Sequence, residues 1–195
     1  MQFVTVDNEL PEREKGVLWL MGILFVCFWL QWFFNERSVE KLFLSRFSLM
    51  QLIFHQFLHV NSIHLLINLV LLYIFGRIVE TRIGIYGLYI LFLLAGVFGG
   101  MFHLLFSGLL AAGASGAISG LIAAALVFDG KSRIYFFDRI FYVQVWIMAT
   151  LWVVKDLIVL AVPSLHTAPA GHLGGFLTGL ICSLLIVEFR KRYVY

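Results

Sequence analysis

Charged residues are scarce in this chain. Only 13% of its 195 residues are Asp, Glu, Lys or Arg, whereas 62% are apolar. A soluble domain is typically about 45–50% apolar and about 25% charged, so the composition excludes an ordinary soluble protein and a disordered chain. Cysteine is scarce too: Cys27 and Cys182 each lie in an apolar run and neither is in a CxxC pair. We interpret both as small buried side chains, which excludes a disulfide-stapled secreted domain.

Basic residues exceed acidic ones only slightly, 14 against 11. The densest basic run is Arg190 to Arg192 at the C-terminus, which is too short to follow a phosphate backbone. We therefore expect no nucleic-acid partner. In an apolar chain, the excess is better interpreted as a signal of membrane orientation.

Long apolar stretches dominate the rest of the chain. A transmembrane helix needs about 20 apolar residues, so six of them take up roughly 120 residues. The stretch 83–128 has no charged residue, is too long for one helix, and should break near 107–113, where small residues gather. The sequence thus predicts an all-α polytopic membrane protein with six transmembrane helices in contact with the lipid bilayer. Their ranges are 17–34, 61–78, two within 83–128, 140–162 and 171–189.

The distribution of Lys and Arg predicts the orientation. With the N-terminus inside, ten of these residues fall in inside segments, three fall in outside segments, and Lys155 falls within a span. We expect a cytoplasmic tail over 1–16, a membrane-embedded domain over 17–189 and a basic cytoplasmic tail over 190–195. The default localisation is a bacterial inner membrane. The first run is retained rather than cleaved, since no small-residue cleavage site follows it.

The first outside loop, 35–60, is amphipathic rather than polar, which is typical of a segment lying in the interface plane. The chain has no internal repeat, which disfavours a transporter built from inverted repeats. It also has no ring of charges that would line a channel.

Polar residues inside membrane spans are candidates for function. The densest set is His55, His59, His64 and Asn68. His64 and Asn68 are four apart, so they share a helix face and can donate hydrogen bonds toward one point. A zinc-protease HExxH string is absent and nothing demands a haem. We therefore expect no metal and no cofactor.

Two glycine-rich segments flank further polar residues. Ser115 stands between Gly113 and Gly116 at an expected helix start, where its hydroxyl is exposed and the helix N-terminus favours a developing anion. The alternative is tight helix packing through Gly116 and Gly120.

His172 opens the last helix, and Gly175 and Gly179 follow it at a four-residue spacing that allows close packing. The alternative is a histidine that caps a glycine seam. In the expected orientation, Ser115, His172 and the His64–Asn68 pair all fall in the outer half of the membrane. Their combination predicts a nucleophile, a base and an oxyanion site.

The chain resembles the rhomboid family of intramembrane serine proteases. The matching strings, in order, are His59 to Asn68, Gly76 with Glu80, Arg82 and Gly84, Gly113 to Gly116, and His172 with Gly175 and Gly179. The resemblance covers about 50–188 and implies a six-helix rhomboid-like bundle. It implies that Ser115 is the nucleophile and His172 the general base of a dyad that requires no carboxylate.

The resemblance assigns further roles. His64 and Asn68, with Gly113 and the Ser115 N–H, would form the oxyanion site. Glu80 and Arg82 would hold the loop between the second and third helices, and Gly116, Gly175 and Gly179 would be structural. Substrates would be transmembrane proteins; the oligomeric state is not indicated. The alternative is a catalytically silent rhomboid-fold chaperone or binding module, whose members usually lack the serine or the histidine.

Two features depart from the family pattern, and a charged pair inside the fifth span is unusual for a membrane helix. Ser119 stands where an aromatic residue often packs on the histidine, so that another ring must substitute or the imidazole is held less firmly. Met50 and Gln51 stand near the place of a Trp-Arg motif in the first loop. Lys155 and Asp156 lie inside the fifth span, either as a local pair or as part of the substrate gate that the family places at this helix.

Overall fold

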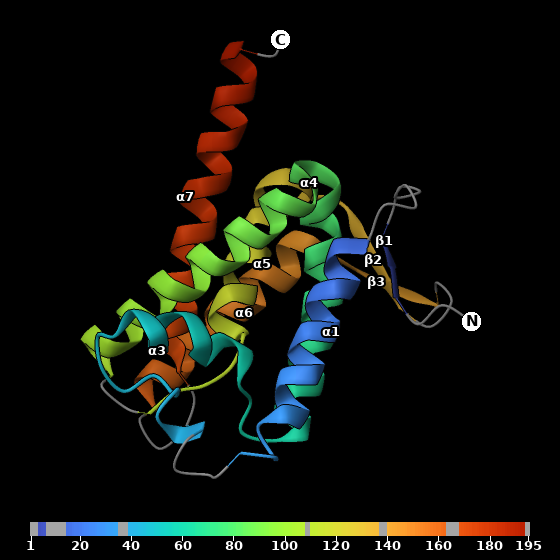
Figure 1. Cartoon of the computed structure of the whole chain (residues 1–195). Coiled ribbons are helices and arrows are strands. Elements are labelled where there is room, and N and C mark those ends of the chain that lie inside the picture. Colours follow the sequence, from blue (N-terminus) through green and yellow to red (C-terminus); the bar gives the residue numbers. More distant parts are fainter. Residues whose placement is uncertain are drawn as a thin grey trace.

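The computed structural model describes residues 4–6, 15–34, 39–107, 110–136, 140–162 and 168–193. The chain is mostly helical (Figure 1). The elements in chain order are β1 (Val4–Val6), α1 (Lys15–Leu30), α3 (Leu49–Phe54), the short 3-10 helix η1 (His55–Phe57), α4 (Ser62–Phe106), α5 (Ser115–Asp129), β2 (Arg133–Phe136), β3 (Phe141–Gln144), α6 (Val145–Ala161) and α7 (Pro169–Tyr193). Most of the N-terminal tail expected over 1–16 lies outside the described residues, as does Pro163.

Helix α4 covers two of the expected spans. It runs for 45 residues, but Gly84 inside it has φ +72, a conformation that glycine adopts readily and that ends regular α-helix. The residue therefore divides α4 into two arms, which Figure 1 shows rising past α1 and then descending toward α3. The break expected near 107–113 is confirmed, since α4 ends at Phe106 and α5 begins at Ser115.

The expectation of an all-α chain is wrong at one place. Strands β1, β2 and β3 form a small antiparallel sheet in that order, with Val4 opposite Phe136 and Arg133 opposite Gln144. Residues 140–144 were expected to begin the fifth helix, which instead starts at Val145. Aromatic and β-branched residues favour strands, and Ile134 of β2 is fully buried. A search for long apolar runs does not detect such short strands.

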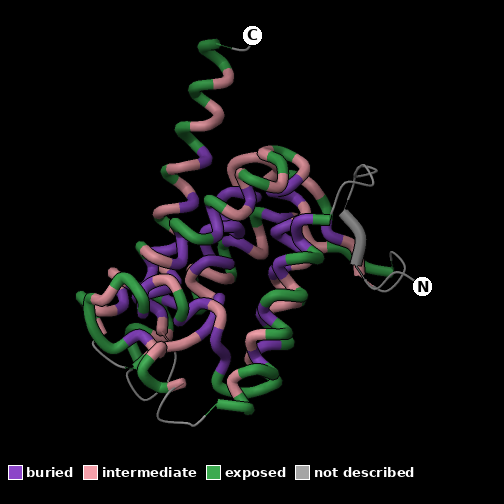
Figure 2. Tube along the Cα trace, viewed as in Figure 1, coloured by how far each residue is buried: buried purple, intermediate pink, exposed green. Residues whose placement is uncertain are grey.

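Helix α5 occupies the centre of the bundle, with α4 and α7 packed against it. Every residue from Ala117 to Ala125 is buried, and Figure 2 shows buried residues gathered in the middle and exposed ones on the outer helix faces. The C-terminal part of α7 projects beyond the other helices (Figure 1). Glycines lie where α5 and α7 face each other, and the lack of side chains there allows the two helix backbones to approach closely.

The outer faces of the helices carry many exposed large apolar side chains. Trp19 of α1, Leu66 of α4 and Leu185 of α7 are each 60% exposed or more, a pattern that suits contact with lipid rather than with water. By length and composition, α4 and α7 are long and apolar enough to cross a membrane among the described helices, and α1 and α5 are apolar but shorter.

Candidate active site

Ser115 and His172 lie side by side. Ser115 is the first residue of α5 and half-buried, and His172 lies in the first turn of α7 and is buried. The distance from His172 Nε2 to Ser115 Oγ is 2.8 Å, which is hydrogen-bond range for a serine and an activating base. The two residues are 57 apart in sequence, so this contact depends on how α5 and α7 pack.

Glycines set that packing. A Cβ atom on Gly175 would overlap the carbonyl oxygen of Gly116, and one on Gly179 would overlap the carbonyl oxygen of Gly120. These neighbours are backbone atoms and cannot swing aside. The packing role expected of Gly116, Gly175 and Gly179 therefore has a direct physical cause, and it coexists with the Ser115–His172 contact.

His64 lies against the glycine that precedes the serine. Gly113 has φ +136, and a Cβ atom there would come within 2.5 Å of His64 Cε1. The imidazole of His64 can lie beside this backbone because no side chain intervenes. His64 is in the first turn of α4, where Asn61 Oδ1 accepts a hydrogen bond from the His64 backbone N–H at 2.8 Å and caps the helix.

Asn68 is fully buried one turn along α4. Its side-chain Nδ2 donates to the backbone oxygen of His64 at 2.8 Å. This bond uses one of its two amide hydrogens within the helix. Its Oδ1 is buried and has no hydrogen-bond partner among the described residues.

The loop before α4 supports the approach to Ser115. The Gly113 N–H donates to the backbone oxygen of His55 at 2.9 Å, and Leu44 and Ala111 form an isolated antiparallel bridge. His59 Nε2 lies 3.5 Å from the Ala114 backbone nitrogen, at the limit of hydrogen bonding. The segment 44–59 thus positions the backbone that leads into α5.

Burial also sets the charge of His55 and His59, which lie between α1 and α4. Burial lowers the pKa of His55 to about 4 despite its hydrogen bond to the Gln51 backbone oxygen. Burial lowers the pKa of His59 to about 4 as well, with a smaller contribution from His64. Both rings are therefore neutral at pH 7.

Gln51 organises the first loop, near the position where the sequence lacks a Trp-Arg motif. Its Oε1 accepts hydrogen bonds from the backbone N–H groups of Ser45 and Arg46, each at 3.1 Å, and its Nε2 donates to the Lys41 oxygen at 2.9 Å. The side chain is buried. A neutral amide thus holds this loop.

Asp156 touches the histidine from α6. Its Oδ1 is 2.9 Å from His172 Nδ1, and Lys155 Nζ is 2.7 Å from the same oxygen. The sequence marked Lys155 and Asp156 as unusual but did not place either of them in the site. The available signal was the spacing of Trp152 and Asp156, which are four apart and so lie on one face of the fifth helix.

Trp152 supplies an aromatic ring at the histidine. Its ring centroid is 5.4 Å from that of His172, and its Nε1 donates to Ser119 Oγ at 2.7 Å. Ser119 is fully buried. The sequence left two alternatives open at this position, and the structure favours the one in which another ring substitutes. The small Ser119 leaves room for Trp152 and accepts its N–H.

Glu80 and Arg82 reach different elements. The Glu80 carboxylate accepts hydrogen bonds from the Gly16 and Val17 N–H groups, both at 2.9 Å, at the start of α1. Arg82 makes a two-pronged contact with Asp129 at the end of α5, with Nε to Oδ2 at 2.6 Å. The carboxylate at a helix N-terminus is a favourable arrangement, and both residues tie the first arm of α4 to neighbouring helices.

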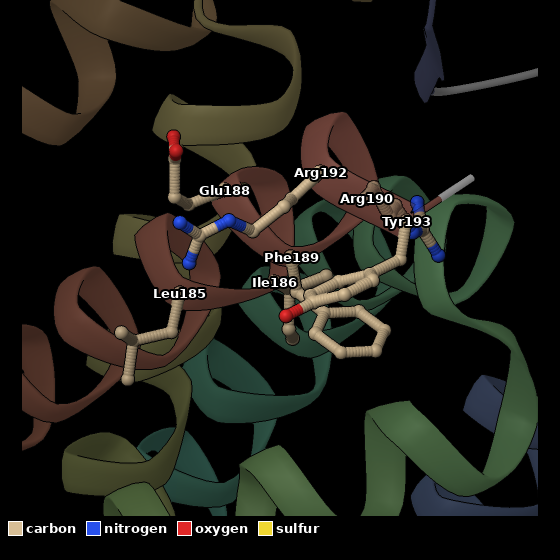
Figure 3. A pocket seen from close by; sticks show the side chains of 7 residues that line it. All are labelled: Leu185, Ile186, Glu188, Phe189, Arg190, Arg192 and Tyr193. Atoms are coloured by element: carbon tan, nitrogen blue, oxygen red, sulfur yellow. The ribbon is translucent and has the colours of Figure 1, made fainter. Parts of the chain in front are cut away.

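Two further observations concern the described residues away from Ser115 and His172. Among the described residues, no group of three His, Cys, Asp or Glu side chains could hold a metal ion. A surface pocket is lined by α7 alone, from Leu185 to Tyr193 (Figure 3). It begins 13 residues beyond His172, which is roughly 20 Å along a helix, so it is separate from the Ser115–His172 contact.

Comparison with known proteins identifies the family of the chain. Residues 46–189 match the family model of the Rhomboid domain. The chain is 33% identical over 126 residues to Rhomboid-like protein 11, chloroplastic, of Arabidopsis thaliana, covering 62% of this chain and 45% of that protein. It is 26% identical over 164 residues to Rhomboid protease GlpG of Yersinia pestis (strain Pestoides F), covering 83% of this chain and 54% of that protein.

The chain spans about half the length of the curated relatives it matches. The Rhomboid match, by contrast, covers most of the chain and includes each side chain described above that contacts Ser115 or His172. The chain belongs to the rhomboid family of membrane proteins.

Proposed function

We propose that this chain is an intramembrane serine protease that hydrolyses peptide bonds in or near the transmembrane segments of membrane proteins. The observation that carries the proposal is the 2.8 Å contact between His172 Nε2 and Ser115 Oγ at the start of α5. A serine within hydrogen-bond reach of a histidine base is the arrangement that nucleophilic catalysis requires.

Acylation begins when Ser115 Oγ attacks the carbonyl carbon of the scissile bond. His172 Nε2 takes the hydroxyl proton as the O–C bond forms. The carbonyl oxygen becomes an oxyanion beside the Ser115 backbone N–H, His64 and the remaining Asn68 amide hydrogen. The C–N bond then breaks, and the same proton passes from His172 to the leaving amine.

Deacylation repeats these roles with water. His172 accepts a proton from the water as its oxygen attacks the acyl carbon, and it returns that proton to Ser115 Oγ when the ester breaks. In this proposal, water enters from the side where α5 and α7 begin, because Ser115 and His172 lie at those helix starts. Since a helical substrate hides its carbonyls in backbone hydrogen bonds, the substrate must unwind locally. Weak helix formers near the end of its span would favour cleavage.

The proposed membrane arrangement has six crossings: α1, the two arms of α4, α5, α6 and α7. The basic end of α7, with Arg190, Lys191 and Arg192, favours a cytoplasmic C-terminus, and the even number of crossings puts the N-terminus on the same side. A bacterial inner membrane is the compartment that we propose.

The test is cleavage of a single-span model substrate in liposomes, with parallel fluorophosphonate labelling. Wild type should cut the substrate and take up label at Ser115. Ser115→Ala should do neither, and His172→Ala should lose at least about 10²-fold in cleavage rate, the usual contribution of a general base. Both variants should keep the helical circular dichroism of wild type.

The result that contradicts the proposal is a folded wild-type protein that neither cuts nor labels with several substrates. That result would favour a silent rhomboid-fold binding module. Ion flux in liposomes that survives Ser115→Ala would point to a channel or carrier instead.

A further inference from the structure

Asp156 completes a line of three polar side chains. It projects from α6, is fully buried, and has Oδ1 2.9 Å from His172 Nδ1. The opposite ring nitrogen, Nε2, is 2.8 Å from Ser115 Oγ. The imidazole therefore has the serine on one side and the carboxylate on the other, and each residue comes from a different helix.

The chemistry of a carboxylate fixes which nitrogen carries the proton. An ionised carboxylate can only accept hydrogen bonds, so His172 Nδ1 must donate to Asp156 Oδ1. In the neutral imidazole this leaves Nε2 with a free lone pair, directed at the Ser115 hydroxyl. The contact thus selects the tautomer that can take a proton from the serine.

A buried carboxylate costs free energy unless it is paired and hydrogen-bonded. Oδ1 of Asp156 has both kinds of partner, because the Lys155 ammonium lies 2.7 Å from the oxygen that also faces His172. Oδ2 is buried and has no hydrogen-bond partner among the described residues. Lys155 is held in turn above the ring of Trp152, with Nζ 4.0 Å from the ring centroid. The ammonium partly balances the carboxylate and leaves its contact with the imidazole intact.

Trp152 restrains the same imidazole from one turn earlier on α6. Its ring packs on His172, and its Nε1 is anchored on Ser119 of α5. Because Trp152 and Asp156 are four residues apart, one face of α6 supplies both a ring contact and a hydrogen bond to the histidine. The side chain at position 119 is small, so α6 rather than α5 carries these contacts.

We propose that Asp156 is a positioning residue for His172, which it orients through Nδ1 and keeps in the tautomer that accepts the Ser115 proton. The site then works as a Ser115–His172–Asp156 triad rather than a dyad. This inference rests on the proposed protease function for its effect on rate, but the Nδ1 hydrogen bond itself can be measured without any substrate.

The kinetic test compares Asp156→Asn, Asp156→Glu and Asp156→Leu with wild type on one model substrate. Loss of the carboxylate should lower kcat by up to about 10⁴-fold, the loss that the equivalent Asp→Asn change causes in another serine protease. KM should change less than threefold, because Asp156 does not touch substrate. Asp156→Glu should recover part of kcat, whereas Asp156→Asn should not. A merely structural role would be served equally well by the isosteric amide.

The matched control is Leu157→Ala, at the neighbouring position on α6. Leu157 is 53% exposed, whereas Asp156 is fully buried, so both kcat and KM should stay near wild type. Thermal unfolding of each variant in micelles checks that the helices remain assembled. If Asp156→Leu loses its fold, Asp156→Asn, which is equal in size to the native side chain, remains the decisive variant.

The structural test uses nitrogen NMR of the protein labelled at its histidines, with His172 assigned by its loss in His172→Asn. Wild type should give a protonated, hydrogen-bonded Nδ1 on His172. Asp156→Asn should shift or remove that signal, and Leu157→Ala should leave it unchanged. This measurement tests the inference even if no substrate is cleaved.

Two results would overturn the inference. One is an unprotonated His172 Nδ1 in wild type at neutral pH. The other is an unchanged kcat in Asp156→Asn while Ser115→Ala is inactive, which would leave the protease proposal intact and remove only the triad. If wild type cuts nothing yet shows the Nδ1 hydrogen bond, the positioning role stands and the protease proposal fails.

Discussion

His55 and His59 combine burial with a supporting position. The backbone oxygen of His55 accepts a hydrogen bond from the Gly113 N–H, and Nε2 of His59 lies beside the Ala114 backbone nitrogen. Both have a pKa lowered to about 4, against about 6.5 in an unfolded chain. The unfolded state therefore binds more protons between these values, and the folded protein loses stability as pH falls through that window.

We predict that the melting temperature in micelles falls as pH is lowered from about 6.5 to about 4. Each histidine contributes at most on the order of 3 kcal/mol to this loss, because one pKa unit corresponds to about 1.4 kcal/mol. The measurement is thermal unfolding followed by circular dichroism across that range. His103 near His55 and His64 near His59 also act on these rings, so the variants decide the assignment.

The matched variants are His55→Asn and His59→Asn. Each should be less stable than wild type at pH 7.5, because a packed ring is lost, but should show a flatter decline toward pH 4. If the double variant declines as steeply as wild type, then acidic side chains or the other histidines are responsible for the pH dependence.

Position 119 carries a small side chain, and the large ring of Trp152 fills the space beside it. This arrangement leads to a second prediction at the residue scale. Trp152→Leu removes both the ring contact with His172 and the hydrogen bond to Ser119, so kcat should fall about 2- to 10-fold, the range that an aromatic pair of about 0.5–1.5 kcal/mol provides. Ser119→Phe alone should be more harmful, because position 119 is fully buried and Trp152 occupies the adjoining space. Rates on one model substrate measure both effects.

The double variant distinguishes this account from simple loss of packing. Ser119→Phe combined with Trp152→Ala moves the ring from α6 to α5, so it should recover activity relative to Ser119→Phe alone. A double variant whose loss equals the sum of the single losses would mean that the two positions do not share one space.

Individual site residues differed in how well the sequence predicted them. Ser115, His172 and His64 stand in short motifs whose order and spacing place them near helix starts, and the structure brings them together. Asp156 does not stand in such a motif. The sequence gives its position along the fifth helix, but the rotation of that helix toward α7 depends on tertiary packing. Only that rotation determines whether Asp156 faces lipid or His172.

At the scale of elements, the close contacts between glycines of α5 and glycines of α7 determine where His172 lies. Gly175 touches the Gly116 backbone through its Cα side, with no room for a methyl group. We predict that Gly175→Ala destabilises the protein by about 1–3 kcal/mol, as overpacking does. It should also reduce activity, since α7 must move away from Ser115. Thermal unfolding and substrate cleavage measure the two effects.

The control is Gly22→Ala in α1. Gly22 is also helical, but nothing lies within 4 Å of a Cβ atom built there. Alanine restricts the unfolded chain and favours helix, so this variant should be as stable as wild type or more stable. If Gly175→Ala has the same melting temperature as Gly22→Ala and keeps full activity, the packing between α5 and α7 tolerates a methyl group at this position and the prediction is wrong.

Whole elements were predicted unevenly, for a physical reason. Apolar runs long enough to cross a membrane are a strong signal, and α1, α4, α5, α6 and α7 overlap the expected ranges. The strands β2 and β3 are four residues each and gain their pairing from each other and from β1. Such pairing between distant segments depends on the fold and leaves little trace in the local sequence.

The whole molecule is polarised along its helices. The starts of α4, α5 and α7 bring His64, Ser115 and His172 to one end, while the end of α7 carries Arg190, Lys191 and Arg192 at the other. A basic end favours the cytoplasmic side, so the site should face the opposite side of the membrane. This polarity leads to a prediction about accessibility rather than activity.

We predict that a cysteine at Phe47 is labelled from outside intact cells and that one at Lys191 is not. Phe47 is 59% exposed in the loop that supports the site, and Lys191 is in the last turn of α7. The background is Cys27→Ala with Cys182→Ala, which removes both native thiols, and the probe is a membrane-impermeant maleimide. Permeabilised cells should label both positions, which controls for thiol reactivity. Labelling of Lys191→Cys alone in intact cells would invert the orientation and put the site on the cytoplasmic side, so its water and its substrates would have to enter from within the cell.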